Sequence, residues 1–198
     1  ESAVLVYDFN KFDGADILRV LEKYKVTTFC VPPTMYRMML LNDVSKYDLS
    51  AIQHCCTAGE ALNPEIYNKW LEATGHKIYE GFGQTETTLC IATIYPWTEP
   101  VPGAIGLPVP GFDVHILDSE NQSCPRGTTG EISIRVLSLD RKPCGLLDTY
   151  NFSEEDTHRA MYSGFYHTGD TAYRDERGLF RYVGRNDDVF KSSGYRIG

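Results

Sequence analysis

The sequence predicts an α/β protein in which a partial parallel βαβ subdomain is followed by a small antiparallel β-barrel-like subdomain. In the first half, β-branched apolar runs alternate with segments of helical periodicity. Prolines and glycines concentrate over residues 96–111, and beyond them apolar residues recur with a period of two. We therefore expect an α/β subdomain over residues 1–95, a connection over 96–111, a β-rich subdomain over 112–184 and a hinge over 185–198.

Short apolar runs predict the strands of the first subdomain. They are Val4–Tyr7, Val26–Val31, Ile52–Thr57, His76–Tyr79 and Leu89–Ile94. Val26–Val31 is β-branched and apolar, which favours a buried strand. In parallel sheets the ligand-binding loops lie at the carboxyl ends of the strands. Gly59-Glu60 and Gly81–Glu86 both follow predicted strands, so we expect them to face one crevice.

Capping residues mark the predicted helices of this half. Asp13 is a candidate N-cap for a helix that begins at Gly14. Asn63 and Pro64 form an N-cap followed by a proline at the first helical position, and Gly75 ends that helix. The apolar faces expected in the core, including a methionine stripe interpreted as core, are Ile17, Val20, Leu21, Tyr24, Met35, Met38, Met39, Ile66, Tyr67, Trp70 and Leu71.

Alternation of apolar and polar residues predicts the antiparallel strands of the second half. They are Phe112–Ile116, Ile132–Val136, Phe165–His167, Thr171–Tyr173 and Leu179–Val183. Arg174–Gly178 is expected to form a turn. Phe152–Ala160 is expected to form a short helix with an acidic first turn. The second half therefore predicts a small barrel or distorted sheet.

Composition narrows the functional classes. The net charge is -8 with no basic cluster, which argues against a nucleic-acid partner. No apolar run approaches the roughly 18 residues of a membrane span. The sequence has six cysteines without a Cys-x-x-Cys pair, so we expect neither a zinc site nor a disulfide framework. The cysteines that fall in apolar runs, where free thiols are commonly buried, are Cys30, Cys55, Cys56 and Cys90.

Both ends of the sequence interrupt predicted elements. Val4–Tyr7 has nothing before it, and Tyr195–Gly198 stops within a motif. We therefore expect an internal piece of a longer protein. The sequence shows no initiator methionine and no basic segment typical of a secretory signal. With free thiols expected, these features predict a cytoplasmic protein.

The motif around which the sequence is organised runs from Tyr79 to Thr87. Gly81 and Gly83 permit close approach of the backbone to a ligand. Thr85 can donate a hydrogen bond to a phosphate oxygen, and Glu86 can bind Mg²⁺, which takes one or two protein carboxylates. Phe82 offers an apolar face to a purine. Taken alone, an ordinary glycine-rich turn explains this motif equally well.

Two further motifs carry polar groups suited to a nucleotide. In Tyr166-His167-Thr168-Gly169-Asp170, the aspartate can accept hydrogen bonds from two adjacent ribose hydroxyls. An Asx-turn is the alternative interpretation. The segment 184–196 contains Arg185, Lys191 and Arg196, and arginine suits phosphate and hydroxyl recognition. A solvated linker is the alternative, and both interpretations hold if the linker is a hinge.

These motifs, in this order, resemble those of the adenylate-forming superfamily of acyl-CoA synthetases, luciferases and peptide-synthetase adenylation domains. Gly81–Glu86 is similar to the family's aromatic-Gly-x-Thr-Glu motif, and Tyr166–Asp170 to its Thr-Gly-Asp motif. Gly184–Ile197 resembles the hinge motif, and Ala58–Ala61 the adenine loop. The resemblance covers nearly the whole chain and is greatest to the medium-chain acyl-CoA synthetases.

The resemblance implies a role for each motif. The residues that would border or contact adenine and the phosphates are Gly59, Glu60, Ala61, Glu80, Gly81, Phe82, Gly83, Gln84 and Thr85. Thr85 would touch the α-phosphate and Glu86 would hold Mg²⁺, so these two residues would be catalytic. Asp170 would bind the ribose hydroxyls with Arg185 beside them.

At the hinge, Asp187 would be the pivot of a C-terminal domain that follows this chain. The residues that would lie near CoA are Ser193, Gly194, Tyr195 and Arg196.

The resemblance implies ATP, Mg²⁺ and CoA as cofactors and co-substrates. A small-molecule carboxylic acid would attack the α-phosphorus of ATP to give acyl-AMP, and the thiol of CoA would then displace AMP. Acetate-specific relatives carry a tryptophan where this chain has Gly83, so a larger acid is expected. The alternatives are a carrier-protein adenylation domain, an aryl-CoA ligase, or a non-catalytic module that retains the fold.

The family's phosphate loop would lie before Glu1 and its catalytic lysine after Gly198. Lys191 belongs to the hinge and is not that lysine. We therefore expect the 198-residue chain to fold without turning over.

Overall fold

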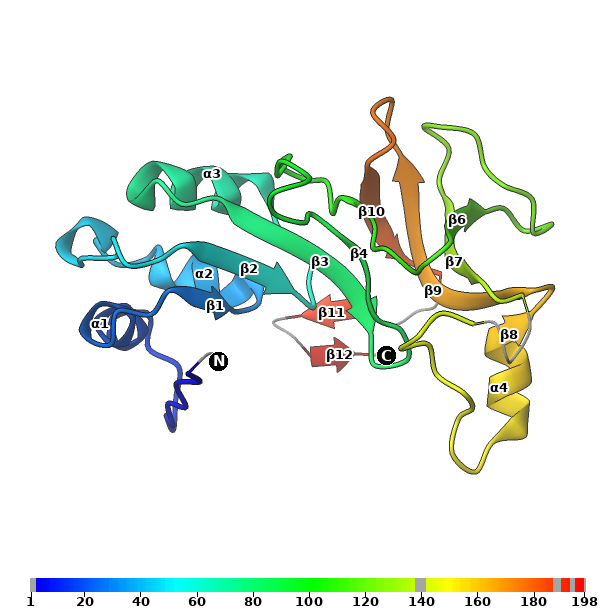
Figure 1. The fold of residues 1–198 in the computed structure, drawn as a ribbon, viewed down its shortest axis with the longest axis horizontal. Helices are drawn as coiled ribbons and strands as arrows, with labels where there is room; N and C mark the ends of the chain where they lie inside the picture. Colours follow the sequence, from blue (N-terminus) through cyan, green and yellow to red (C-terminus); the bar gives the residue numbers. More distant parts are fainter. Residues whose placement is uncertain (1–2, 138–141, 187–189, 193–194, 198) are drawn as a thin grey trace.

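The computed structural model describes residues 3–137, 142–186, 190–192 and 195–197, the last two ranges by their backbone only. Two sheets lie side by side, with three of the helices gathered at the end of the first sheet (Figure 1). The first sheet contains β1 (Thr28–Cys30), β2 (His54–Ala58), β3 (Ile78–Gln84), β4 (Thr88–Ala92) and β5 (Leu107–Pro108), in that order. The second sheet has the order β10-β9-β7-β6, with β8 paired to β9.

The strands of the second sheet are β6 (Val114–Leu117), β7 (Gly130–Arg135), β8 (Met161–Tyr162), β9 (Phe165–Arg174) and β10 (Phe180–Arg185). All of its pairings are antiparallel. In the first sheet β1, β2 and β3 are parallel, whereas β4 and β5 pair antiparallel. The predicted α/β class, a parallel βαβ part followed by a curled antiparallel part, is therefore confirmed.

Helix positions follow the predicted capping residues. Asp13 accepts hydrogen bonds from the backbone N–H groups of Ala15 and Asp16, at the start of α1 (Gly14–Lys23). Asn63 caps α3 (Pro64–Thr74) in the same way, and Gly75 ends it in a left-handed conformation. The other helices are α2 (Pro33–Met39), a 3-10 turn (Val44–Lys46) and α4 (Glu154–Ala160). Helix α4 starts two residues later than predicted, because Ser153 is its N-cap.

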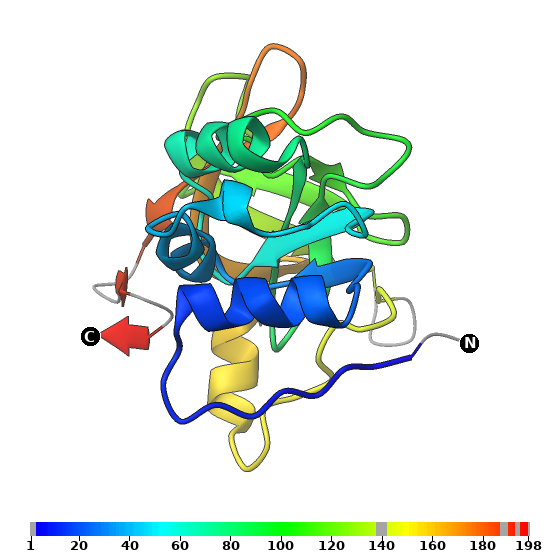
Figure 2. The same cartoon turned by 90° about the vertical axis from the view of Figure 1, so that its left-hand side faces the viewer.

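A hydrophobic core forms where α1, α2 and α3 cover the first sheet, as seen from the helical end in Figure 2. Tyr36 of α2 and Trp70 of α3 are fully buried, and their ring centroids are 5.0 Å apart with an edge-on geometry. Met39 is also fully buried, as the methionine stripe predicts. A second core lies inside the curled sheet and includes Ile132, Ile134 and Phe180.

Four predictions for the first half are wrong. Tyr24, expected in the core, is 52% exposed at the end of α1. Val4–Tyr7 forms no strand in the described structure, and its side chains stay exposed. Phe29 of β1 packs against the helical core, but Thr28 and Cys30 lie on the opposite face and are exposed. The expected burial of this strand and of the Cys30 thiol therefore does not hold. The residues that follow Tyr79 form no loop, because β3 continues through both glycines to Gln84 and only residues 85–87 turn.

The second half also differs from expectation at three places. The two short strands predicted around Thr168-Gly169-Asp170 are one strand, β9, whose pairing with β7 is interrupted by a bulge. Leu107–Pro108, in the predicted connection, pairs with β4 as part of the first sheet. In the predicted hinge, β11 (Phe190–Ser192) and β12 (Tyr195–Ile197) form a hairpin. In the described parts of the chain no helix is both long and apolar enough to cross a membrane.

Candidate functional site

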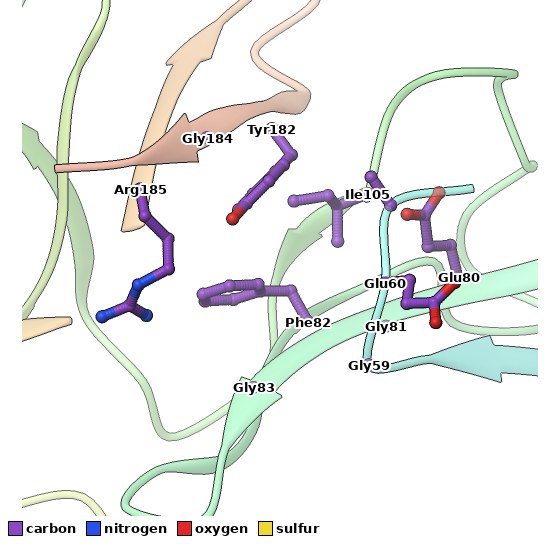
Figure 3. Close-up of a pocket in the computed structure, with 11 residues that line it drawn as sticks. Gly59, Glu60, Glu80, Gly81, Phe82, Gly83, Ile105, Tyr182, Gly184 and Arg185 are labelled. Atoms are coloured by element: carbon purple, nitrogen blue, oxygen red, sulfur yellow. The ribbon is translucent and has the colours of Figure 1, made fainter. Parts of the chain in front are cut away.

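A cavity of about 370 Å³ opens between the two sheets. Segments from four parts of the sequence line it, and Figure 3 shows their side chains converging. The lining residues are Gly59, Glu60, Ala61, Glu80, Gly81, Phe82, Gly83, Ile105, Tyr182, Gly184 and Arg185. The prediction that Gly59-Glu60 and Gly81–Glu86 face one crevice is confirmed for Gly81–Gly83, whereas Gln84–Glu86 does not line this cavity.

Phe82 reaches the cavity from β3, two residues before that strand ends in the β3–β4 hairpin. A bulge interrupts this hairpin, because Phe82 pairs with Ile91 while Gly83 pairs with Leu89. A Cβ atom on Gly83 would lie 1.8 Å from the carbonyl oxygen of Thr88, so only glycine fits there. The close approach of two backbones therefore explains this glycine.

Tyr182 and Arg185 reach the site from β10. They are three residues apart, and in a regular strand they would lie on opposite faces. Tyr182 pairs with Ala172 and Arg185 pairs with Asp170, so an irregularity between Tyr182 and Gly184 brings both side chains to one face. The rings of Phe82 and Tyr182 face each other across the cavity with centroids 6.2 Å apart (Figure 3).

Asp170 lies behind this cavity with only 1% of its surface exposed. Its Oδ1 accepts a hydrogen bond from the Tyr182 hydroxyl at 2.8 Å. Its Oδ2 accepts from Gln84 Nε2 at 2.5 Å and lies 3.3 Å from Arg185 Nη1. A buried carboxylate with this many donors is held in one orientation.

Gln84 connects the two sheets. Its amide nitrogen also donates to the carbonyl oxygen of Thr168 at 2.8 Å, and its amide oxygen accepts from the Tyr166 hydroxyl at 2.9 Å. The end of β3 in the first sheet is therefore tied to the bulge of β9 in the second.

Two glutamates hold the segment 59–62 beside the cavity. Glu80 is 8% exposed, and its Oε1 accepts a hydrogen bond from the backbone N–H of Leu62 at 3.0 Å. Burial raises the pKa of Glu80 from 4.5 to about 7, against the lowering effect of the Leu62 N–H. Glu60 Oε2 accepts from the Thr34 hydroxyl at 2.7 Å, while its Oε1 is buried with no hydrogen-bond partner among the described residues.

A second cavity of about 460 Å³ lies on the other side of Arg185, which lines both cavities. Glu86 lines this second cavity, and its Oε1 accepts a hydrogen bond from the Tyr150 hydroxyl at 3.2 Å. A single carboxylate is within the protein share that Mg²⁺ takes when phosphates and water complete its shell. Among the described residues there is no group of three or more metal-binding side chains.

The predicted site residues are not all gathered at the cavities. Thr85 is exposed in the hairpin turn and lines neither cavity, although its neighbours Gln84 and Glu86 both line the second. Ser193, Gly194 and Asp187 lie outside the described residues. Tyr195 and Arg196 belong to β12, of which only the backbone is described.

Sequence reasoning missed several residues of the site. Tyr182 and Ile105 line the first cavity, and Tyr150, Tyr166 and Glu131 line the second. Tyr182 is two residues before Gly184, within a run recognised only as a strand. Its direction depends on the irregularity in β10, which no local pattern signals.

Comparison with known proteins identifies the family. Residues 2–139 match the family described as AMP-binding enzyme. The chain belongs to the AMP-binding enzyme family. It is 42% identical over 197 residues to the acyl-coenzyme A synthetase ACSM3, mitochondrial, of Mus musculus, and 37% identical to ACSM5, mitochondrial, of Homo sapiens. The match covers 100% of this chain and 33% and 34% of these relatives, so the chain spans about a third of their length.

Solved structures of AMP-binding enzymes share its fold. The anthranilate CoA ligase AuaEII in complex with anthranoyl-AMP superposes with a TM-score of 0.78 and 30% identity, over 93% of this chain and 34% of that one. ATP-bound MatB of Rhodopseudomonas palustris superposes with a TM-score of 0.79 and 26% identity, over 96% of this chain and 36% of that one. The resemblance to the adenylate-forming superfamily is confirmed.

The expected cytoplasmic location is wrong by the same comparison. The ACSM3 relatives of Mus musculus, Rattus norvegicus and Homo sapiens are all named mitochondrial. The expectation depended on free cysteines and on the lack of a secretory signal, and neither feature distinguishes one intracellular compartment from another.

Proposed function

We propose that the full-length protein is an AMP-forming acid–thiol ligase that activates a carboxylic acid with ATP and transfers the acyl group to CoA. Membership of the AMP-binding enzyme family supports this proposal. The structural observation that carries it is the convergence of residues 59–61, Phe82 and the Tyr182–Arg185 strand end on one cavity beside a buried aspartate. This arrangement fits the base and ribose of a nucleotide.

Adenine would lie in the first cavity, bordered by Gly59, Glu60 and Ala61 and stacked on Phe82. The segment 59–61 presents backbone groups, and Gly59 adopts a positive φ of 90°. Glu80 would support this wall of the cavity through its bond to Leu62. Protein groups that are held in place before the ligand arrives lower the entropic cost of binding.

Asp170 would accept hydrogen bonds from the ribose hydroxyls, and Arg185 would lie beside these hydroxyls. In the structure Arg185 and Tyr182 already contact the Asp170 carboxylate. Ribose would therefore join or replace donors that the protein supplies itself. Thr85 would reach the α-phosphate from the hairpin turn, where this residue is exposed.

Glu86 would hold Mg²⁺, which would neutralise phosphate charge when bound. Of this chain's groups, Gln84 orients the turn through its bonds to the second sheet, and Tyr150 restrains the Glu86 carboxylate. Arg185 lies between the two cavities, where it would face the phosphate side of the nucleotide. Both half-reactions concentrate negative charge, so fixed donors and cations would supply most of the catalysis.

We propose that the acid is larger than acetate, because this chain has Gly83 where acetate-specific relatives carry a bulky tryptophan. The likeness to an anthranilate CoA ligase makes an aryl acid the second candidate.

We also propose that the chain divides into four parts: residues 1–95, 96–111, 112–184 and 185–198. In the last part, Ser193, Gly194, Tyr195 and Arg196 would approach CoA.

ATP–pyrophosphate exchange by the full-length protein tests this function. The acid panel should contain acetate, straight-chain acids of intermediate length, and benzoate-type acids. We expect exchange with at least one acid larger than acetate, and thioester formation when CoA is added. Exchange that continues without thioester formation would favour a carrier-protein adenylation domain. Lack of exchange with every acid would favour a non-catalytic module.

A further inference from the structure

Glu131 of β7 and His167 of β9 form a buried pair next to Asp170, and no nucleotide contact described above uses it. The side chains of His167 and Glu131 are 6% and 18% exposed, and His167 Nδ1 lies 2.8 Å from Glu131 Oε2. The other carboxylate oxygen, Oε1, accepts a hydrogen bond from the backbone N–H of Gly169 at 2.8 Å. Both oxygens of Glu131 thus contact the strand that carries Asp170.

The pairing of β7 with β9 shows why this contact matters. Glu131 pairs with Thr171 and Ser133 pairs with His167, so Ile132 alone faces the three residues Thr168, Gly169 and Asp170. The additional residues must bend out of the ladder, and Gly169 does so with a φ of 72°. The conformation of this bulge decides the direction of the Asp170 side chain.

Several hydrogen bonds hold the bulge in place besides the strand ladder, including the Gln84 bond to the Thr168 carbonyl and a bond from the Asn186 N–H to the Gly169 carbonyl at 2.8 Å. Thr168 Oγ1 donates to the carbonyl oxygen of Ile132 at 2.7 Å and accepts from the Asp170 N–H at 3.1 Å. Glu131 binds the N–H of Gly169, the residue with the left-handed conformation. A charged acceptor makes the stronger of these bonds.

His167 in turn restrains Glu131. Its ring is stacked on Tyr162 of β8, with centroids 3.8 Å apart and an interplanar angle of 3°. The imidazole is therefore fixed on one side by the tyrosine ring and at Nδ1 by the carboxylate. This places Glu131 between an immobilised ring and the bulge.

We propose that Glu131 is a positioning residue for the nucleotide. It fixes Gly169, and through Gly169 it sets the direction of the Asp170 carboxylate. The inference rests on the proposed function, in which Asp170 binds the ribose hydroxyls. Glu131 lines the second cavity, but the role proposed here needs no contact with the nucleotide, because it acts through the bonds of its two oxygens to β9.

Binding of ATP, 2′-deoxy-ATP and 3′-deoxy-ATP to the full-length protein, measured by calorimetry, tests the inference. The wild type should bind ATP more tightly than at least one deoxy analogue. In Glu131→Ala the affinity for ATP should fall by about tenfold, the size of effect expected for a lost charge-assisted hydrogen bond. The affinity for that deoxy analogue should change little, because it lacks a hydroxyl for Asp170 to bind.

Conservative replacement and a mutant cycle strengthen the test. Glu131→Gln keeps an oxygen that can accept a hydrogen bond from the Gly169 N–H, so it should retain the preference for ATP. This variant also tests the inference if Glu131→Ala does not fold. In an Asp170→Ala background, Glu131→Ala should cause no further loss. Asp113→Ala is the matched control, because it breaks another histidine–carboxylate pair of the same sheet, Asp113–His115 at 2.9 Å, away from the bulge.

The possible failures are distinguishable. If the wild type does not prefer ATP to either deoxy analogue, Asp170 does not bind the ribose hydroxyls. Both the proposed nucleotide contact and this inference are then wrong. If the wild type shows the preference and Glu131→Ala keeps it, only the positioning role is wrong. Equal losses for ATP and the analogues, or losses that add to those of Asp170→Ala, would also contradict that role.

Discussion

At the scale of single residues, Asp170 is the group on which the site depends. Three side chains from two strands donate to it or lie in ion-pair contact with it: Gln84 of β3, and Tyr182 and Arg185 of β10. A carboxylate this deeply buried needs such partners, because an uncompensated buried charge costs several kcal/mol. The same partners hold its oxygens in place behind the cavities, although Asp170 itself lines neither of them.

Two replacements of Tyr182 distinguish the contribution of its hydroxyl from that of its ring. In Tyr182→Phe the bond to Asp170 is lost, and we expect the free energy of unfolding to fall by about 1–3 kcal/mol. The ring still faces Phe82, so ATP affinity should fall less than in Tyr182→Ala. Denaturant unfolding and calorimetric titration measure the two effects. Equal ATP affinity in the two variants would show that the ring does not border the nucleotide.

Glu80 makes stability depend on pH. Its pKa is raised from 4.5 to about 7 by burial, so the folded protein binds this proton more tightly than the unfolded chain does. Its contribution to stability is complete below pH 4.5 and is lost as pH rises through 7. Glu80→Gln should remove this slope, a difference of roughly 3 kcal/mol across the interval. Unfolding curves of both proteins at several pH values test the sign, and parallel pH profiles would contradict the prediction.

At the scale of elements, irregularities in regular strands build the site. The bulge in the β3–β4 hairpin accompanies Phe82, the one in β10 brings Tyr182 and Arg185 to one face, and the one in β9 directs Asp170. Each shifts the alternation of side chains by the residues it adds. A sheet of perfect register would point some of these groups away from the cavity.

The β3–β4 hairpin should be intolerant of any side chain at position 83. In Gly83→Ala the new Cβ would lie 1.8 Å from the Thr88 carbonyl oxygen, so the hairpin must shift. We expect a loss of about 3 kcal/mol in the free energy of unfolding. Gly184→Ala is the control, because a Cβ there meets no atom within 4 Å. If both variants unfold at the same denaturant concentration, the close approach of the two backbones is not a constraint.

At the scale of the whole molecule, two sheets of different construction contribute to one site. The first has a core under three helices, and the core inside the curled second sheet also includes Cys90 and Ile91 of β4 from the first. Gln84 links them through Thr168 and Asp170, which lie 84 and 86 residues away in the sequence. The site therefore requires both sheets to be folded and docked.

Activity should require more than this chain. Because the chain covers 33% of the length of its ACSM3 relatives, we predict that the isolated 198 residues catalyse no ATP–pyrophosphate exchange, whereas the full-length protein does. The measurement compares both proteins at equal concentration with the acid that the full-length protein prefers. Measurable acyl-AMP formation by the isolated chain would contradict the prediction.

The sequence by itself determined much of this protein. Asp13 and Asn63 marked two helix starts because capping is a local interaction, and alternating residues marked β6 and β7 because strand burial has a local period. The family motifs indicated Gly59–Ala61, Phe82 and Arg185, which the structure brings to one cavity.

Only the tertiary structure decided how those residues meet. Val4–Tyr7 was predicted as a strand and forms none, because a strand requires a neighbour that no local pattern supplies. Tyr182 and Glu131 join the site through register shifts in β10 and β9, which depend on the partner strand. Local composition sets which residues favour a strand, whereas pairing between distant segments sets where their side chains point.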